Sequence, residues 1–299
     1  MTRRDLFAGA AATGVLLGAP APTFRKGICS AAFPKGVSYA DCVAQAANAG
    51  FAAIELRLEP GGELSLTSTR DQARRIADTA RAHRVEIASL WALTPSSPAL
   101  TSPDPEIRQQ AMAIARKSIE LAPALNCESI LLVAGVLGRG PHMQANYRQA
   151  WDRATAAYRE LLPGAEEARV TLTPENVWSK FLVSSRDMRD FVDQFQSPRV
   201  RVHFDTGNVM QYGYPEDWIE MLGARIHRVH LKDYKLSARG EQGRFVPLLE
   251  GDVQWKDVMG DLVKSGYRGF LTAETGPAPD DPDHLGKISR AVDRILNLI

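Results

Sequence analysis

The sequence predicts one α/β domain in which eight strands alternate with helices, the pattern of a (β/α)8 barrel. Short apolar runs of about five residues recur along the chain, and amphipathic stretches with helical periodicity separate them. About 270 residues follow the first 26, a length typical of such a barrel. A doubly wound sheet is the main alternative, but no GxGxxG pattern follows the first apolar run.

Residues 1–26 are expected to precede the fold as a signal peptide. Arg3 and Arg4 form a basic start, residues 8–17 are apolar or small, and residues 18–21 suit a cleavage region. The arginine pair favours a twin-arginine signal, and the apolar stretch is too short for stable membrane insertion, which needs about 20 residues. We therefore expect residues 27–299 to form the barrel domain. We expect the twin-arginine machinery to export it to the periplasm or the exterior.

The first half of the chain contains four strand–helix units. Ser38 begins a capping box for the first helix, and Gly50 ends that helix. Ser68 is expected to open the second helix, whose apolar residues follow the i, i+3, i+4, i+7 spacing. The expected strands span residues 27–31, 51–56, 85–90 and 129–133, and two further helices span residues 106–122 and about 144–162.

The second half continues the same alternation. The expected strands span residues 169–173, 200–204, 226–231 and 270–273. Apolar residues at helical spacing follow each of them, at 188–195, 215–222, 255–263 and 288–295. No linker or change of composition divides the chain, so we expect a single domain after the signal peptide.

Overall composition and charge exclude several classes of protein. The chain has 299 residues, 44% of them hydrophobic and 24% charged, as in ordinary soluble domains. Its 36 Lys and Arg nearly balance its 35 Asp and Glu, so nucleic acid is not an expected partner. The cysteines are Cys29, Cys42 and Cys127, without a CxxC, which excludes a disulfide framework and a zinc ribbon.

Polar residues at the ends of the last four expected strands carry the predicted chemistry. Glu175, Asp205, His230 and Glu274 each follow or close one strand, and these ends meet at one rim of a barrel. Three carboxylates gathered there would repel each other unless a cation is bound among them. Oxygen and imidazole ligands together suit Mn²⁺, Mg²⁺, Co²⁺ or Zn²⁺. The sequence therefore predicts one divalent metal ion held by these four residues.

Several motifs resemble the xylose-isomerase-like superfamily of sugar phosphate isomerases and epimerases. The second-half motifs are more specific than the second-strand signature at residues 50–56, and the resemblance covers about residues 27–299. It implies a TIM barrel, and the ketose-epimerase branch implies metal ligands at Glu175, Asp205, His230 and Glu274. The motifs are Glu175-Asn176, Phe204-Asp205-Thr206-Gly207-Asn208, Val229-His230-Leu231-Lys232-Asp233, Glu250-Gly251-Asp252-Val253 and Gly269-Phe270-Leu271-Thr272-Ala273-Glu274.

The resemblance implies a metal-dependent isomerase that moves a proton next to a carbonyl through an enediolate. Glu175 and Glu274 are the expected acid/base pair, which would epimerise a sugar or interconvert aldose and ketose. Because sugar phosphates are cytoplasmic and export is expected, an unphosphorylated sugar or keto-sugar is the predicted substrate. A lyase or dehydratase of a keto-sugar or inosose needs the same residues and stays the alternative. A non-catalytic sugar-binding protein would not need the intact carboxylate set.

Further residues are candidate substrate contacts. His203 shares one side of its strand with Asp205, and packing inside the barrel is its alternative role. Two positions differ from the ketose epimerases, with Leu236 in place of an arginine and Phe181 in place of a second glutamate. The candidate contacts, all close to expected strand ends, are His203, Asn208, Lys232, Asp233, Glu55, Trp91 and Trp178.

Overall fold

The computed structural model of the protein describes residues 24–138, 145–237 and 241–299. The predicted signal peptide therefore lies outside the described residues up to position 23. The first strand begins at Arg25, whose backbone N–H donates to the carbonyl of Gly269. The strand expected at residues 27–31 thus begins and ends two residues earlier, because Arg25 and Lys26 already pair with the last barrel strand.

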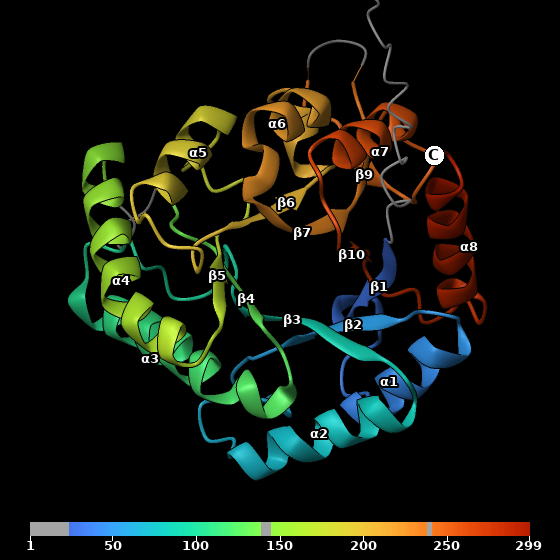
Figure 1. Ribbon diagram of the computed structural model, residues 1–299, viewed down its shortest axis with the longest axis horizontal. Helices are drawn as coiled ribbons and strands as arrows, with labels where there is room; N and C mark the ends of the chain where they lie inside the picture. Colours follow the sequence, from blue (N-terminus) through green and yellow to red (C-terminus); the bar gives the residue numbers. More distant parts are fainter. Residues whose placement is uncertain (1–23, 139–144, 238–240) are drawn as a thin grey trace, which may run out of the picture.

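Eight parallel strands form the predicted barrel (Figure 1). Around the ring the order is β5-β4-β3-β2-β1-β10-β7-β6. Single bridges join Leu172 to Val200 and Glu175 to His203, which brings the two end strands together. The strands are β1 (Arg25–Cys29), β2 (Ala53–Arg57), β3 (Glu86–Leu93), β4 (Ser129–Leu132), β5 (Thr171–Thr173), β6 (Val202–Asp205), β7 (Ile226–Leu231) and β10 (Phe270–Ala273).

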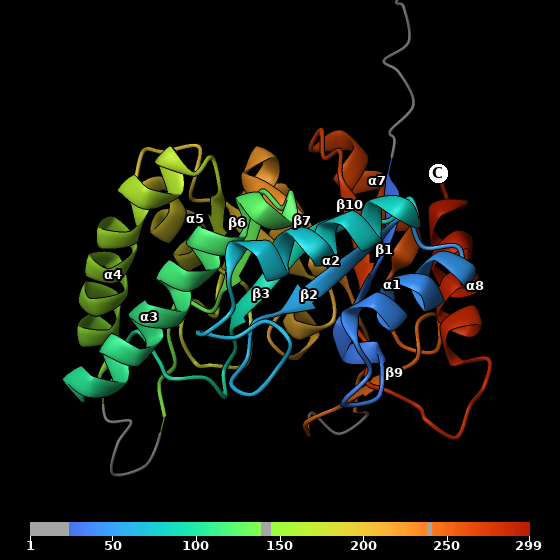
Figure 2. The same ribbon diagram turned by 90° about the horizontal axis from the view of Figure 1, so that it is seen from below.

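Among the described residues, eight α-helices surround the ring of strands. Figures 1 and 2 show this arrangement. Their apolar faces pack against the outside of the barrel and form the main core. The helices are α1 (Tyr39–Asn48), α2 (Arg70–Ala82), α3 (Pro105–Leu121), α4 (Tyr147–Glu167), α5 (Ser185–Asp193), α6 (Pro215–Leu222), α7 (Trp255–Lys264) and α8 (His284–Leu296). The fold thus matches the sequence prediction of one barrel domain over the described residues.

Local capping chemistry explains where the early helices begin. Ser38 caps α1 by accepting from the backbone N–H of Asp41, as predicted. At α2 the prediction was one residue early, because Thr69 and Gln72 form a reciprocal capping box. The Ser68 hydroxyl instead accepts from the backbone N–H of Ser65 and belongs to the preceding turn.

A two-stranded hairpin after β7 was not predicted. It pairs β8 (Asp233–Lys235) with β9 (Arg244–Val246) in antiparallel register. Each strand has three residues, too few to show a hydrophobic period in the sequence. The hairpin follows the strand that carries His230, so it forms part of the wall on the C-terminal side of the barrel.

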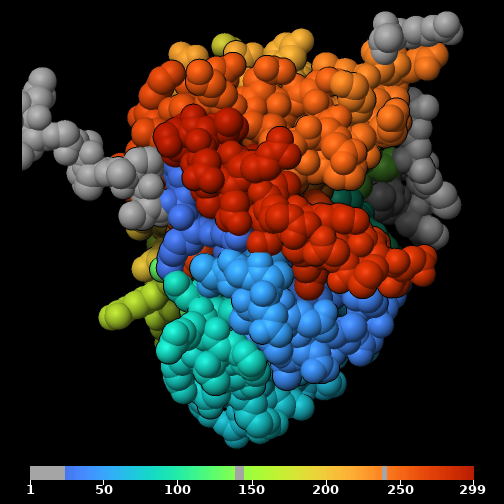
Figure 3. Space-filling model, turned by 90° about the vertical axis from the view of Figure 1, so that its right-hand side faces the viewer, coloured from blue at the N-terminus to red at the C-terminus, as the bar shows by residue number. Residues whose placement is uncertain are grey.

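The end of the chain closes onto its beginning. In Figure 3, α8 crosses the surface between the blue N-terminal elements and the orange C-terminal ones. The Lys26 ammonium donates to Ser289 Oγ at 2.8 Å and to Asp293 Oδ1 at 2.6 Å, which joins β1 to α8. Within the part of the chain that the structure describes, no helix is both long and apolar enough to span a bilayer.

Candidate active site

The four predicted metal ligands converge at the C-terminal rim of the barrel. Glu175 follows β5, Asp205 ends β6, His230 lies in β7 and Glu274 follows β10. The four ligand atoms all lie within 4.8 Å of one another. His230 Nδ1 is 2.8 Å from Glu274 Oε2, 3.1 Å from Glu175 Oε1 and 3.8 Å from Asp205 Oδ2. The imidazole therefore faces all three carboxylates with the same nitrogen.

Asn176 fixes the position of Asp205. Its side-chain amide donates to the Asp205 carbonyl and accepts from the Asp205 N–H, both at 2.8 Å. Asp205 Oδ1 accepts from the backbone N–H of Asn208 at 2.7 Å. These bonds leave the other carboxylate oxygen, Oδ2, directed at the cluster, where it accepts no hydrogen bond.

Lys232 brings a positive charge to the same place. Its Nζ lies 2.9 Å from Glu274 Oε2 and 3.2 Å from Asp205 Oδ2. Burial opposes the charged form, but the carboxylates of Asp205, Glu274 and Glu175 outweigh it and raise the pKa of the Lys232 ammonium. Lys232 therefore neutralises part of the negative charge that the three carboxylates concentrate here.

The two candidate acid/base glutamates differ in electrostatic environment. Burial raises the pKa of Glu175 to about 7, although His230 partly opposes the shift. Burial acts in the same direction on Glu274, but Lys232 and His230 outweigh it and lower the pKa of that carboxyl to about 2. Two carboxyls whose pKa values differ in this way can take different roles, one as the proton donor and the other as the proton acceptor.

The donor set fits a divalent cation. Asp205 Oδ2 and Glu274 Oε2 are both buried and neither accepts a hydrogen bond, although Lys232 lies within ion-pair distance. Buried carboxylate oxygens without hydrogen-bond partners are costly unless a cation satisfies them. Three carboxylates and one imidazole are the ligand types that first-row divalent metals accept. The residues Glu175, Asp205, His230 and Glu274 would hold such an ion.

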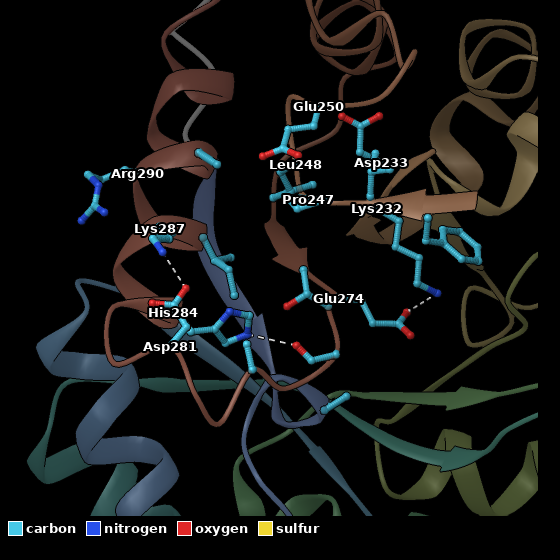
Figure 4. Close-up of a pocket in the computed structure, with 18 of the residues that line it drawn as sticks. Lys232, Asp233, Pro247, Leu248, Glu250, Glu274, Asp281, His284, Lys287 and Arg290 are labelled. Atoms are coloured by element: carbon cyan, nitrogen blue, oxygen red, sulfur yellow. Dashed lines mark hydrogen bonds and ion pairs between the residues drawn. The ribbon is translucent and has the colours of Figure 1, made fainter. Parts of the chain in front are cut away.

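A cavity of about 860 Å³ adjoins this cluster. Figure 4 shows Lys232 and Glu274 on one side of it, with His284, Lys287 and Arg290 of α8 on the other. Pro247 and Leu248 contribute an apolar wall from the loop between β9 and α7. The volume lies in the range of small-molecule binding sites.

The match to known proteins decides the family. A family model described as "Xylose isomerase-like TIM barrel" matches residues 43–292. The chain belongs to this family. It is 25% identical over 258 residues to a putative L-ribulose-5-phosphate 3-epimerase of Haemophilus influenzae, covering 83% of this chain and 87% of that one. It is 26% identical over 262 residues to the L-ribulose-5-phosphate 3-epimerase of Escherichia coli, covering 86% and 89%.

Solved structures show the same barrel. The D-psicose 3-epimerase of Clostridium cellulolyticum superposes with a TM-score of 0.74 at 17% identity, covering 92% of this chain and 99% of that one. The 3-keto-D-glucoside 4-epimerase of Escherichia coli gives 0.72 at 13% identity, covering 91% and 99%. At these identities the likeness concerns the fold.

In this xylose isomerase-like barrel, Glu55 and His203 lie inside the ring of strands. Both side chains are fully buried. Glu55 Oε1 lies 2.9 Å from Nε2 of His230, and its other oxygen accepts from the Ser89 hydroxyl. Burial lowers the pKa of His203 well below its ordinary value, so this imidazole is neutral. Neither residue lines the cavity.

Two further candidate contacts hold loops of the barrel mouth. Asn208 Nδ2 donates to the Asn176 carbonyl, so that side chain joins the loops after β5 and β6. The Asp233 carboxylate accepts five hydrogen bonds, from backbone N–H groups and the Trp255 indole, which order the loop between β9 and α7. Gly251 approaches so closely that a Cβ there would lie 2.0 Å from Asp233 Oδ1.

Aromatic residues pack beside the polar side chains of the site. Trp91 lies edge-on to His230, with ring centroids 6.3 Å apart, and the Arg57 guanidinium covers its face. The Trp178 indole donates to the Asn208 carbonyl and stacks on Phe245 at 5.0 Å. Sequence reasoning missed Phe245 and Ser89, because one lies in the unpredicted hairpin and the other is an ordinary-looking residue within β3.

The two departures from the ketose epimerases are visible in the structure. Phe181 is buried in an aromatic cluster with Trp151 and Phe191, so no carboxylate is present at that position. Leu236 is exposed at the end of β8 and brings no cation. Lys232 is therefore the cationic side chain that the described residues place in contact with the carboxylate cluster.

Proposed function

We propose that the protein is a divalent-metal-dependent sugar epimerase or isomerase that transfers a proton at the carbon next to a carbonyl. The convergence of Glu175, Asp205, His230 and Glu274 within 4.8 Å carries this proposal. Relatives of similar length are L-ribulose-5-phosphate 3-epimerases, which supports epimerase chemistry. A bound divalent ion supplies Lewis acidity at a substrate oxygen, which makes the neighbouring C–H more acidic.

The chain's own carboxylates would move the proton. Glu274 is held in its ionised form by Lys232 and His230, so it is ready to accept a proton from carbon. Glu175 has a pKa of about 7 and can hold a proton near neutral pH. If one glutamate removes the proton from the carbon and the other returns a proton on the opposite face, the configuration at that carbon is inverted. Return to the neighbouring carbon would give aldose–ketose isomerisation.

We further propose an unphosphorylated sugar or keto-sugar as substrate and an exported location for the protein. The named relatives act on a pentulose phosphate, whereas the predicted twin-arginine signal favours a substrate found outside the cytoplasm. Changing Arg3 and Arg4 together to Lys is expected to retain a folded precursor in the cytoplasm. Cell fractionation checks this, and unchanged export of that variant would contradict the twin-arginine route.

A lyase is the second candidate, because Lys232 offers a buried ammonium beside the two acid/base groups. Its Nζ lies 2.9 Å from Glu274 Oε2, close enough to serve a reacting group that Glu274 contacts. After proton removal by Glu274, an ammonium can protonate a departing hydroxyl and complete the loss of water. A Lys232→Met variant would then lose elimination while retaining exchange of the carbon-bound proton.

One experiment separates these candidates. Unphosphorylated ketoses, glycosides, their keto forms and pentulose phosphates are incubated with Mn²⁺-loaded protein in D₂O and followed by NMR and mass spectrometry. An epimerase or isomerase incorporates deuterium next to the carbonyl and yields a product that has lost no water. A lyase product is lighter by one water. Protein with confirmed metal that exchanges no proton in any of these compounds would contradict both candidates.

A further inference from the structure

We propose that Glu55 is a positioning residue of the metal site, holding the Nε2–H of His230 so that Nδ1 presents its lone pair to the ion. The inference rests on the proposed function, because it concerns the same site. It assigns Glu55 a role different from the substrate contact that its place near the end of the expected second strand suggested. The residue acts through His230 from inside the barrel.

The geometry joins two strands across the barrel interior. Glu55 lies in β2 and His230 in β7, and β1 and β10 separate these strands in the sheet. Glu55 Oε1 nevertheless lies 2.9 Å from His230 Nε2. Both side chains have 0% exposure, so water does not compete for this contact. A charge-assisted hydrogen bond in such surroundings is strong and directional.

The two nitrogens of His230 face different partners. Nδ1 points at Glu175, Asp205 and Glu274, the three carboxylates of the metal site. Nε2 points at Glu55, its hydrogen-bond partner among the described residues. A neutral imidazole carries one N–H, and a metal ion needs the nitrogen that lacks it. Since the carboxylate at Nε2 accepts that N–H, the ring is left with its free lone pair at Nδ1.

Glu55 is itself oriented by a second donor. The Ser89 hydroxyl, from β3, donates to Glu55 Oε2. His203 lies nearby, but its Nε2 is 4.0 Å from that oxygen, and neither of its ring nitrogens forms a hydrogen bond within the described structure. The carboxylate is therefore fixed by Ser89 on one oxygen and by His230 on the other. Outer partners that orient a ligand imidazole in this way typically strengthen metal binding about 10–100-fold.

Glu55, His203 and His230 also lie close enough to suggest a second cation site. The contact between Glu55 and His230 has the length of an ordinary hydrogen bond, so these two groups already satisfy each other. A second ion would have to displace the proton between them. The stoichiometry of bound metal therefore tests the positioning role directly, with one ion per chain expected and two overturning it.

The first test compares metal affinity in three proteins. Wild type, Glu55→Gln and Ser89→Ala are titrated with Zn²⁺ against a competing chelator, and each metal-free protein is melted separately. Glu55→Gln removes the charge that holds the Nε2–H, so its affinity is expected to fall about 10–100-fold. Ser89→Ala keeps that carboxylate and is the matched control, with a smaller loss. A purely structural role would lower the melting temperature of metal-free Glu55→Gln and leave the affinity of its folded form unchanged, which would overturn the proposal.

The second test uses wild-type protein and so does not depend on a variant that folds. In the Zn²⁺-loaded form, ¹⁵N NMR is expected to show His230 bound through Nδ1 and protonated at Nε2. That proton should be shifted downfield and exchange slowly, because it is buried against a carboxylate. The signal is assigned by its loss in His230→Gln. Zinc on Nε2 would overturn the positioning role, whereas wild type that binds no metal at all would overturn the proposed function.

Discussion

Glu175 and Glu274 have the same side chain, but different neighbouring residues give their carboxyls different pKa values. Both lie close to His230 Nδ1, Glu175 buried and Glu274 partly buried, and of the two Glu274 also contacts Lys232, at 2.9 Å. The pKa of Glu175 is raised to about 7, and that of Glu274 is lowered to about 2. The two carboxyls therefore differ in protonation at neutral pH in the metal-free protein, which is what a donor and an acceptor require.

Replacing either glutamate by Gln is expected to separate chemistry from metal binding. Gln keeps the size and one ligand oxygen but removes the basic carboxylate. Turnover should fall about 10²–10⁴-fold while much of the metal is retained. Metal analysis and deuterium exchange check both variants, and each is expected to exchange the proton of one epimer without inverting it. Wild-type turnover in both would leave Glu175 and Glu274 as ligands only.

Among the secondary elements, the β8–β9 hairpin and the loop after it depend on one buried carboxylate. Asp233 accepts from the backbone N–H groups of Leu249 and Gly251 and from the Trp255 indole, in addition to two more N–H groups. The same loop supplies Pro247 and Leu248 to the cavity wall. The order of this wall therefore follows from hydrogen bonding to Asp233.

We expect Asp233→Asn to lower the free energy of unfolding by about 3 kcal/mol, because an amide NH₂ then faces buried donors. Urea denaturation of the metal-free protein measures the change. Asp252→Asn is the matched control, since Asp252 pairs with Lys235 nearer the surface and its loss should cost less than about 1 kcal/mol. Equal effects of the two substitutions would show that Asp233 does not order the loop.

Strand β7 also carries a histidine that makes the protein sensitive to acid. Burial, with Arg228, Arg201 and Arg199 nearby, lowers the pKa of His227 to about 2. The folded protein thus keeps this ring neutral, whereas the unfolded chain protonates it below about pH 6.5. Because the unfolded state binds the extra proton, this contribution to stability is lost as pH falls from about 6.5 towards 2.

His227→Gln should therefore weaken the dependence of stability on pH. Between about pH 6 and pH 4 the free energy of unfolding of the variant should fall less steeply than that of wild type, by about 1.4 kcal/mol per pH unit. Urea denaturation at each pH gives the slopes. His83→Gln, at the exposed end of α2, is the control and should keep the wild-type slope. Identical slopes for all three proteins would contradict a neutral His227 in the folded protein.

For the whole molecule, the sequence pattern was sufficient to predict the barrel. It was also sufficient to predict that Glu175, Asp205, His230 and Glu274 lie together. Strand–helix alternation determines the topology, and the topology brings strand ends to one rim. The contact between Glu55 and His230 could not be predicted from the sequence, because it depends on how residues 175 positions apart meet across the barrel. The hairpin was missed for a local reason, since three-residue strands have no readable period.

The proposed metal site and the fold are also linked energetically, because the four proposed ligands lie in or directly after four different strands. Without a cation, the buried carboxylates of Glu175 and Asp205 and the partly buried carboxylate of Glu274 repel each other, and Lys232 offsets only part of this charge. A divalent ion that binds only the folded barrel stabilises it by mass action, by about 2.7 kcal/mol at a free concentration of 100 times Kd.

Addition of Mn²⁺ or Zn²⁺ is therefore expected to raise the melting temperature of the metal-free protein, and EDTA to reverse the rise. Asp205→Ala removes a buried ligand and should abolish the response, while Asp71→Ala, an exposed carboxylate on α2, should retain it. Calorimetry together with metal analysis measures both effects. The shift should grow with the logarithm of metal concentration above Kd, which distinguishes one specific site from weak surface binding. An equal response in Asp205→Ala and wild type would place the ion elsewhere and contradict the four-residue metal site.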